Sequence, residues 1–245
     1  MNGEVDIAAA AQLLAEPTRA RVLLALMDRR ALPASVLARE AGVAPSTASA
    51  HLGKLIDAGF LAVEQHGRHR YYRLSGPPVA EVIEALGAVA PEAPVRSLRE
   101  GTRAHALRQA RTCYDHLAGR LGTAVMGALI ERGALTGGDG RFDPETAQQD
   151  RLSAAGHDVR YELTPDGVAL LRDLGLELDD RPAIRYCVDW SEQRHHLAGR
   201  VGAALTQRMF ELDWIRRART PRAVRVTDAG REGLRDVLGC ELSQS

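Results

Sequence analysis

The chain has 245 residues, which exceeds the length of one typical domain and favours two compact units. Its composition, 45% hydrophobic and 26% charged, excludes a disordered or fibrous chain. Lys+Arg and Asp+Glu both number 32, so any surface that attracts nucleic acid must be local. Three cysteines without a CxxC arrangement exclude a disulfide scaffold. The sequence contains no run of 18 apolar residues and its acidic start does not resemble a signal peptide, so we expect a cytoplasmic protein.

The first 90 residues have the pattern of several short helices followed by one hairpin. Amphipathic spacing and polar or proline starts predict helices at Val5–Ala15, Thr18–Asp28, Pro33–Ala41, Pro45–Ala58 and Val79–Val89. Alternation predicts two strands, Phe60–Gln65 and Arg70–Leu74, around a basic turn that contains Gly67. Helices followed by a hairpin predict a winged helix-turn-helix over residues 1–90, with 79–89 available as a dimer contact.

Prolines at 91 and 94 predict a linker at 91–101 and a second domain at 102–245. Apolar residues at alternating steps of three and four, from Leu107 to Ala128, predict one long helix that ends near Gly133. The expected fold class is α+β, mainly α with small β-hairpins.

The second domain contains an internal repeat. The stretch from His116 to Gly122 recurs from His196 to Gly202. A second similarity links the segment that contains Thr164 to the segment that contains Thr227. Each copy is expected to run helix, loop, strand, threonine-capped turn and helix. The repeated glycines, Gly119 and Gly122 with Gly199 and Gly202, predict close backbone approach about a pseudo-twofold axis.

A DNA-reading surface is predicted on the helix Pro45–Ala58 and the hairpin after it. Small polar side chains near a helix N-terminus can enter a major groove, and a basic hairpin can hold phosphates. The candidate DNA-binding residues are Ser46, Thr47, Ser49, His51, Lys54, Arg68, His69, Arg70 and Tyr72.

Three segments resemble the ArsR/SmtB family of bacterial winged-helix repressors. They are Glu16–Leu26, Ser46–Phe60 and Gly67–Leu74, and the resemblance covers about residues 5–90. It implies a homodimer that binds double-stranded DNA at an inverted-repeat operator and leaves it when an inducer binds. It also implies that the helix side chains approach bases or backbone, while Arg68 and Arg70 hold phosphates or the minor groove.

The sequence departs from the metal-sensing members of that family. Paired cysteines precede the recognition helix in those members, whereas Pro33–Arg39 has none, and the helix after the wing offers only Glu81 and Glu84. The resemblance therefore transfers no metal-sensing function. The long second half resembles that of a larger subgroup with an added domain of unassigned ligand.

The second half gathers thiol, carboxylate, imidazole and aromatic groups beside the repeated glycines. The candidate effector residues are Cys113, Tyr114, Asp115, His116, Tyr186, Cys187, Asp189, Trp190 and His196. Cys113 and His116, three apart on the expected helix, would share a face and suit zinc or copper. The alternatives are a small organic effector lined by Tyr114, Tyr186 and Trp190, thiol redox sensing, and a purely structural domain that enlarges the dimer.

No GxSxG, HExxH, P-loop or dinucleotide motif occurs, so an enzyme is not expected. A Cys113 and His196 hydrolase is a remote alternative. We expect no required cofactor and no membrane partner, and Cys240 is assigned no role.

Overall fold

The computed structural model describes residues 5–91, 97–179 and 182–242. Contacts divide the chain into two compact units, Met1–Ile83 and Glu84–Ser245, each described below by itself. The division falls inside helix α5 (Pro77–Val89). The sequence instead predicts a linker at 91–101, of which 92–96 lie outside the described residues and 98–101 begin a helix.

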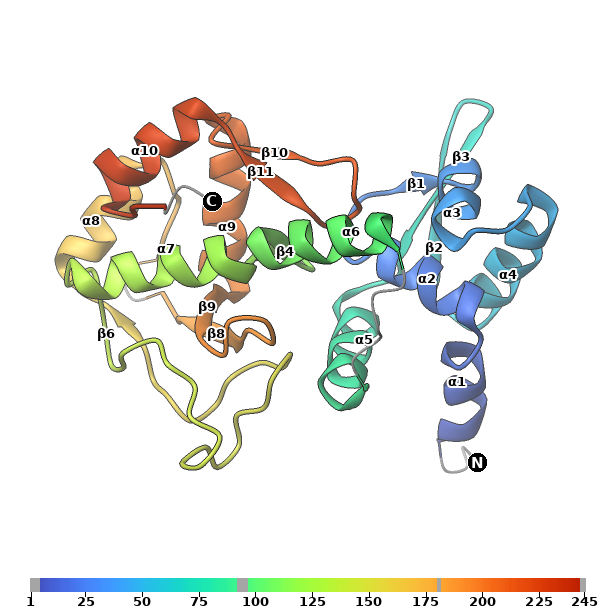
Figure 1. Cartoon of the computed structure of the whole chain (residues 1–245), viewed down its shortest axis with the longest axis horizontal. Coiled ribbons are helices and arrows are strands. Elements are labelled where there is room, and N and C mark those ends of the chain that lie inside the picture. The colour runs from blue at the N-terminus through green and yellow to red at the C-terminus, as the bar shows by residue number, and fades with distance from the viewer. Residues whose placement is uncertain (1–4, 92–96, 180–181, 243–245) are drawn as a thin grey trace. The chain divides into compact units, whose positions relative to one another are not determined.

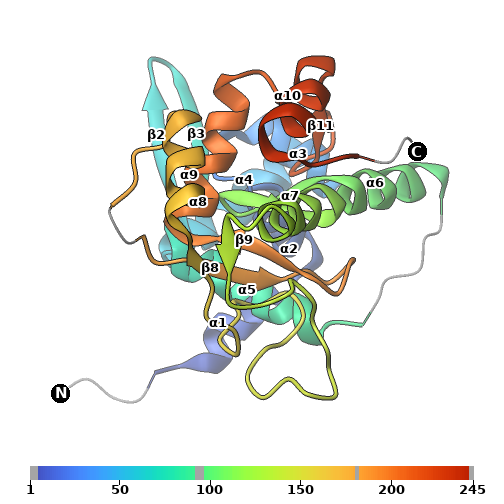
Figure 2. The same ribbon diagram turned by 90° about the vertical axis from the view of Figure 1, so that its left-hand side faces the viewer.

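The first unit is a winged helix-turn-helix. Its elements are α1 (Ile7–Leu14), α2 (Pro17–Ala25), β1 (Leu32–Pro33), α3 (Ala34–Ala41), α4 (Pro45–Asp57), β2 (Leu61–His66) and β3 (His69–Leu74). The strands form one antiparallel sheet in the order β1-β3-β2, and the β2–β3 hairpin projects from the helices as the wing (Figures 1 and 2). The predicted helices and hairpin are confirmed here, with boundaries that differ by only a few residues.

Local chemistry sets the helix ends in this unit. The Glu16 side chain accepts the Arg19 N–H at 2.8 Å and caps α2, whose first residue is Pro17. Gly42 follows the last residue of helix α3 as its C-cap and adopts the left-handed conformation at φ 72°. Helix α4 turns Leu52 and Leu55 into the core, so its polar side chains lie on the opposite face.

The second unit is built from two runs with the same element order, hairpin, helix, hairpin, helix, preceded by α6 (Leu98–Gln109). The first run is β4 (Arg111–Cys113), β5 (His116–Ala118), α7 (Gly119–Glu131), β6 (Leu135–Thr136), β7 (Glu162–Leu163) and α8 (Pro165–Asp173). The second is β8 (Arg185–Val188), β9 (His195–Ala198), α9 (Gly199–Glu211), β10 (Ile215–Arg217), β11 (Val224–Val226) and α10 (Asp228–Leu238). Each pair of consecutive strands forms its own antiparallel sheet.

The long helix predicted from Leu107 to Ala128 is wrong. Helix α6 ends at Gln109, the β4–β5 hairpin follows, and α7 begins only at Gly119, which has φ 72°. All three residues of β4 and of β5 are buried. Strands that are buried on both faces lack the alternation that marks a strand in a sequence, and the apolar spacing here also fits a helix.

The two repeated threonines behave as the repeat predicts. Thr164 and Thr227 cap α8 and α10, because their hydroxyl oxygens accept the N–H groups of Gly167 and Gly230 at 3.1 and 2.9 Å. Both runs share one hydrophobic core, which includes Leu121, Met126, Leu129, Val201, Leu205 and Met209. The two runs therefore fold as one domain.

The repeated glycines make room for the opposite run. A Cβ added at Gly122 would lie 2.5 Å from Leu117 O and 3.5 Å from the Cβ of His196. At Gly202 it would lie 2.6 Å from Leu197 O and 3.2 Å from the Cβ of His116. Each helix is thus pressed against the strand before it and against the histidine of the other copy. This reciprocal packing is what a pseudo-twofold arrangement requires.

Candidate functional site

The predicted recognition helix, α4, presents its small polar side chains to solvent. Ser46, Thr47, Ser49 and Lys54 are exposed, and the Ser49 hydroxyl donates to Pro45 O at 2.9 Å. His51 lies differently, because its Nδ1 is 3.4 Å from a Glu16 carboxylate oxygen and its side chain is only 17% exposed. His51 therefore links α4 to the start of α2, and the other four form the free polar surface.

The wing carries a group of exposed basic side chains at its tip. Arg68, His69 and Arg70 are exposed around the turn at Gly67, whose φ is 61°. Tyr72 is only 7% exposed and belongs to the core. The expectation that Tyr72 faces DNA therefore needs correction. Its ring supports Arg70, whose guanidinium carbon is 5.7 Å from the ring centroid.

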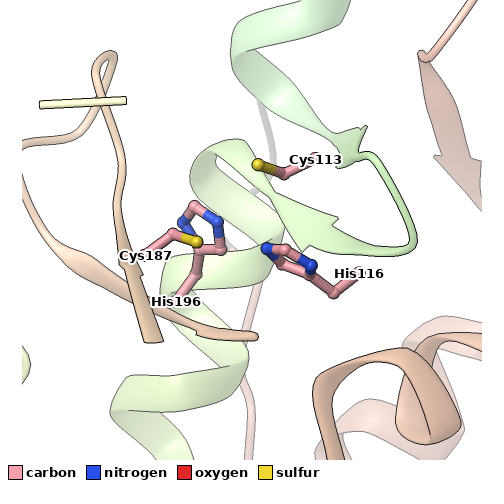
Figure 3. A group of neighbouring side chains, drawn as sticks. All are labelled: Cys113, His116, Cys187 and His196. Atoms are coloured by element: carbon pink, nitrogen blue, oxygen red, sulfur yellow. The ribbon is translucent and has the colours of Figure 1, made fainter. Parts of the chain in front are cut away.

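In the second unit, two hairpins bring together Cys113, His116, Cys187 and His196, here called the Cys-His cluster. One ligand atom of each residue lies within 4.8 Å of every other, and the four side chains point toward one another (Figure 3). Cys113 pairs across the strands with His116, and Cys187 with His196. The predicted shared helix face is wrong, since the juxtaposition comes from strand register. The register is the same in both copies although the second hairpin has a longer loop.

Carboxylates orient both histidine rings. Asp115 Oδ1 lies 3.0 Å from His116 Nδ1, and Asp189 Oδ2 lies 3.3 Å from His196 Nδ1. The other ring nitrogen, Nε2, is buried in both histidines and has no hydrogen-bond partner among the described residues, and the Nδ1 of His196 is also too poorly aligned with Asp189 for a hydrogen bond. An unsatisfied buried polar atom costs about 1–3 kcal/mol. Two such nitrogens beside two sulfur atoms mark a place where a further ligand would be stabilised.

Asp189 joins the two copies. Its Oδ2 accepts from Arg111 at 2.8 Å and from the Gly119 N–H at 2.7 Å, while Oδ1 accepts from the Ser191 N–H and hydroxyl. The Arg111 and Asp189 side chains are 3% and 0% exposed. Burial alone would raise the pKa of Asp189, but the adjacent His196 ring nitrogen and the charges of Arg111 and His196 hold it well below its usual range. Asp189 is therefore an anion.

The Cys113 thiol is held in its neutral form. Hydrogen bonding to Cys187, burial and the negative charge of Glu84 raise the pKa of Cys113. The Glu84 carboxylate accepts a hydrogen bond from Cys113 Sγ at 2.7 Å. A reactive thiol needs an accessible thiolate, so this environment disfavours both redox sensing and nucleophilic catalysis by Cys113.

The three aromatic residues predicted to line an organic effector pocket differ in burial and in their neighbours. Tyr186 is 2% exposed, donates to Asp150 Oδ2 at 2.6 Å and stacks 4.3 Å from the His195 ring. Trp190 is 38% exposed and its ring covers the buried Arg111, whose guanidinium carbon lies 4.9 Å from the ring centroid. Tyr114 occupies the β4–β5 turn at φ 56°. Protein neighbours thus surround Tyr186, and its place in an effector pocket stays a prediction.

Sequence reasoning missed Arg111, and it also missed Asp150 beside Tyr186. The signal for Arg111 was present, because Arg111-Thr-Cys113 is echoed by Arg185-Tyr-Cys187. The structure uses the two copies differently, since Arg111 is buried against Asp189 and Arg185 is exposed.

Residues 14–64 match the helix-turn-helix domain family. The chain is 42% identical over 231 residues to YdfF of Bacillus subtilis (strain 168), an uncharacterized HTH-type transcriptional regulator, with 92% of this chain and 94% of YdfF covered. The chain belongs to the HTH-type transcriptional regulators. This confirms the expected class of protein and places the chain among regulators, so the Cys113 and His196 hydrolase is not supported.

Solved structures match the winged helix-turn-helix part of this HTH-type regulator. The homodimeric DNA-binding domain of Mb0332 from Mycobacterium bovis, a possible ArsR-family regulator, is 27% identical, covering 40% of this chain and 96% of that one, with a TM-score of 0.32. Rv0081 from M. tuberculosis is 30% identical, covering 34% and 83%, with a TM-score of 0.32. No helix in the described ranges is long and apolar enough to cross a membrane.

Proposed function

We propose that this HTH-type regulator is a cytoplasmic, homodimeric repressor that binds an inverted-repeat operator and is released by an effector bound to its second unit. The observation that carries the proposal is that one winged helix-turn-helix unit exposes both the polar side chains of α4 and the arginines of the wing. A helix of this kind enters the major groove, and a dimer would place two of them about 34–36 Å apart.

Exposed apolar side chains support the dimer. Helix α1 buries none of its residues, and Val5 and Ile7 are 79% and 73% exposed. In α5, Val82, Leu86 and Val89 are also exposed. Apolar side chains clustered on exposed helices are typical of a protein interface.

The test is a fluorescence-anisotropy titration of DNA from the region upstream of the gene, over a salt series, with a scrambled duplex as control. We expect tight binding to the upstream DNA only. Arg68→Ala combined with Arg70→Ala should weaken binding and lower the slope of log affinity against log salt by about 0.9 for each lost phosphate contact.

Arg160→Ala is the matched control, because it removes an exposed arginine from the second unit and should leave the slope unchanged. If the double wing variant bound with wild-type affinity and slope, the wing would not contact DNA. Equal, weak binding to both duplexes would contradict operator recognition in this region.

A further inference from the structure

The Cys-His cluster has the composition and burial of a metal site. Cys113, His116, Cys187 and His196 are between 1% and 8% exposed, and their ligand atoms lie within 4.8 Å of one another. Two cysteines and two histidines form a tetrahedral set typical of zinc. Bonds of about 2.0–2.3 Å from a central zinc ion require ligand separations of roughly 3.3–3.8 Å. Each ligand atom therefore needs to move by about an ångström or less.

The histidine orientation is an independent observation. Metal-bound histidines usually present one ring nitrogen to the ion and the other to a carboxylate. Asp115 pairs with His116 Nδ1 at 3.0 Å, and Asp189 Oδ2 lies 3.3 Å from His196 Nδ1. Among the described residues, both Nε2 atoms are buried without a hydrogen-bond partner. Each histidine thus has a carboxylate beside its Nδ1, although only His116 makes a hydrogen bond to it.

Charge selects the class of ion. A divalent cation with two thiolates and two neutral imidazoles has no net charge, which suits a buried position, whereas a monovalent ion would leave one negative charge uncompensated. The Glu84 carboxylate loses its hydrogen bond from Cys113 Sγ when the thiol is deprotonated, so it must turn away from the sulfur as the ion binds. Binding replaces two S–H bonds with two metal–sulfur bonds and releases two protons to solvent. Thiolate and imidazole ligands together favour zinc over magnesium or calcium.

We propose that Cys113, His116, Cys187 and His196 form one binding site for a thiophilic divalent cation, such as Zn²⁺, which bridges the two copies of the second unit. We further propose that occupancy of this site is the signal that releases operator DNA, because deprotonation of Cys113 breaks its hydrogen bond to Glu84 on α5, the helix whose exposed apolar residues support the dimer. This second proposal rests on the proposed function. The site lies outside the positions where the resembled family carries its cysteine pairs.

The site is tested by titrating reduced, chelator-treated full-length protein with Co²⁺ and then with Zn²⁺. Wild type should take up one equivalent of Co²⁺, show thiolate-to-cobalt charge-transfer absorption, and lose that absorption when Zn²⁺ displaces the cobalt. Cys113→Ser and Cys187→Ser should abolish the absorption. Cys240→Ser is the matched control, because Cys240 is also buried and free but lies outside the cluster.

Asp115→Asn keeps the test decisive if a serine variant fails to fold. Asp115 is a positioning residue whose side chain is 25% exposed, so the variant should keep the wild-type melting temperature and the cobalt spectrum. Its metal affinity should fall by about 10–100-fold. Absence of Co²⁺ uptake by wild type, or charge-transfer absorption that survives in Cys187→Ser, would overturn the site.

Regulation is tested by repeating the anisotropy titration with one equivalent of Zn²⁺. We expect operator affinity to fall at least about tenfold in wild type and Cys240→Ser, but not in Cys187→Ser. If protein that has bound the metal kept its operator affinity, metal binding would not be the release signal, but the metal site itself would stand. If neither form preferred operator to scrambled DNA, the proposed function would fail, and the cobalt spectrum would still decide the site.

Discussion

At the scale of single residues, Asp189 connects more parts of the second unit than its sequence neighbourhood indicates. It accepts hydrogen bonds from Arg111 and Gly119 of the first copy and lies beside His196 of its own copy. Removing one partner of a buried ion pair leaves the other charge without compensation. The effect of Asp189 on stability should therefore greatly exceed that of an exposed aspartate.

We predict that Asp189→Ala lowers the free energy of unfolding of the second unit by about 3–5 kcal/mol. Asp179→Ala is the control, because Asp179 pairs with Arg200 at the surface and should change stability by less than about 1 kcal/mol. Urea denaturation followed by circular dichroism measures both. Similar midpoints for the two variants would show that the Arg111 and Asp189 pair contributes little.

At the scale of elements, the helix-to-strand packing of the second unit depends on glycine. The sequence repeat correctly marked Gly122 and Gly202, but it did not reveal that each of these two glycines faces the histidine of the other copy. That pairing depends on how the copies pack, which no local pattern encodes.

We predict that Gly122→Ala and Gly202→Ala each destabilise the second unit by about 1–3 kcal/mol, because the new methyl group meets a backbone carbonyl that cannot rotate away. Gly53→Ala should instead stabilise the protein by up to about 1 kcal/mol, since helix α4 leaves open space there. Thermal unfolding of the three variants measures this contrast. Wild-type stability of the Gly122 and Gly202 variants would contradict the close packing.

At the scale of the whole molecule, the proposed function requires two copies of the chain. We predict that wild type sediments as a dimer with twice the 26.5 kDa mass of one chain. Ile7→Asp should raise the dimer dissociation constant at least about tenfold, which corresponds to about 1.4 kcal/mol, because it places a charge on the exposed apolar face of α1.

Arg160→Asp is the matched control for the dimer, since it places the same charge on an exposed side chain outside α1 and α5. It should sediment like wild type. Monomeric wild type over a wide concentration range would refute the dimer, and dimeric Ile7→Asp would place the interface away from α1.

The sequence by itself determined the first unit, because its helices have caps, prolines and amphipathic spacing, and its wing has a glycine turn between alternating strands. It also predicted the threonine caps and the repeated glycines, which depend on residues a few positions apart. Only the tertiary structure decided the β4–β5 hairpin, the burial of Tyr72 and Tyr186, and the meeting of Cys113 and His116 with Cys187 and His196. The physical reason is distance along the chain. The cluster joins residues more than 70 positions apart, and its short buried strands carry no periodic signal of their own.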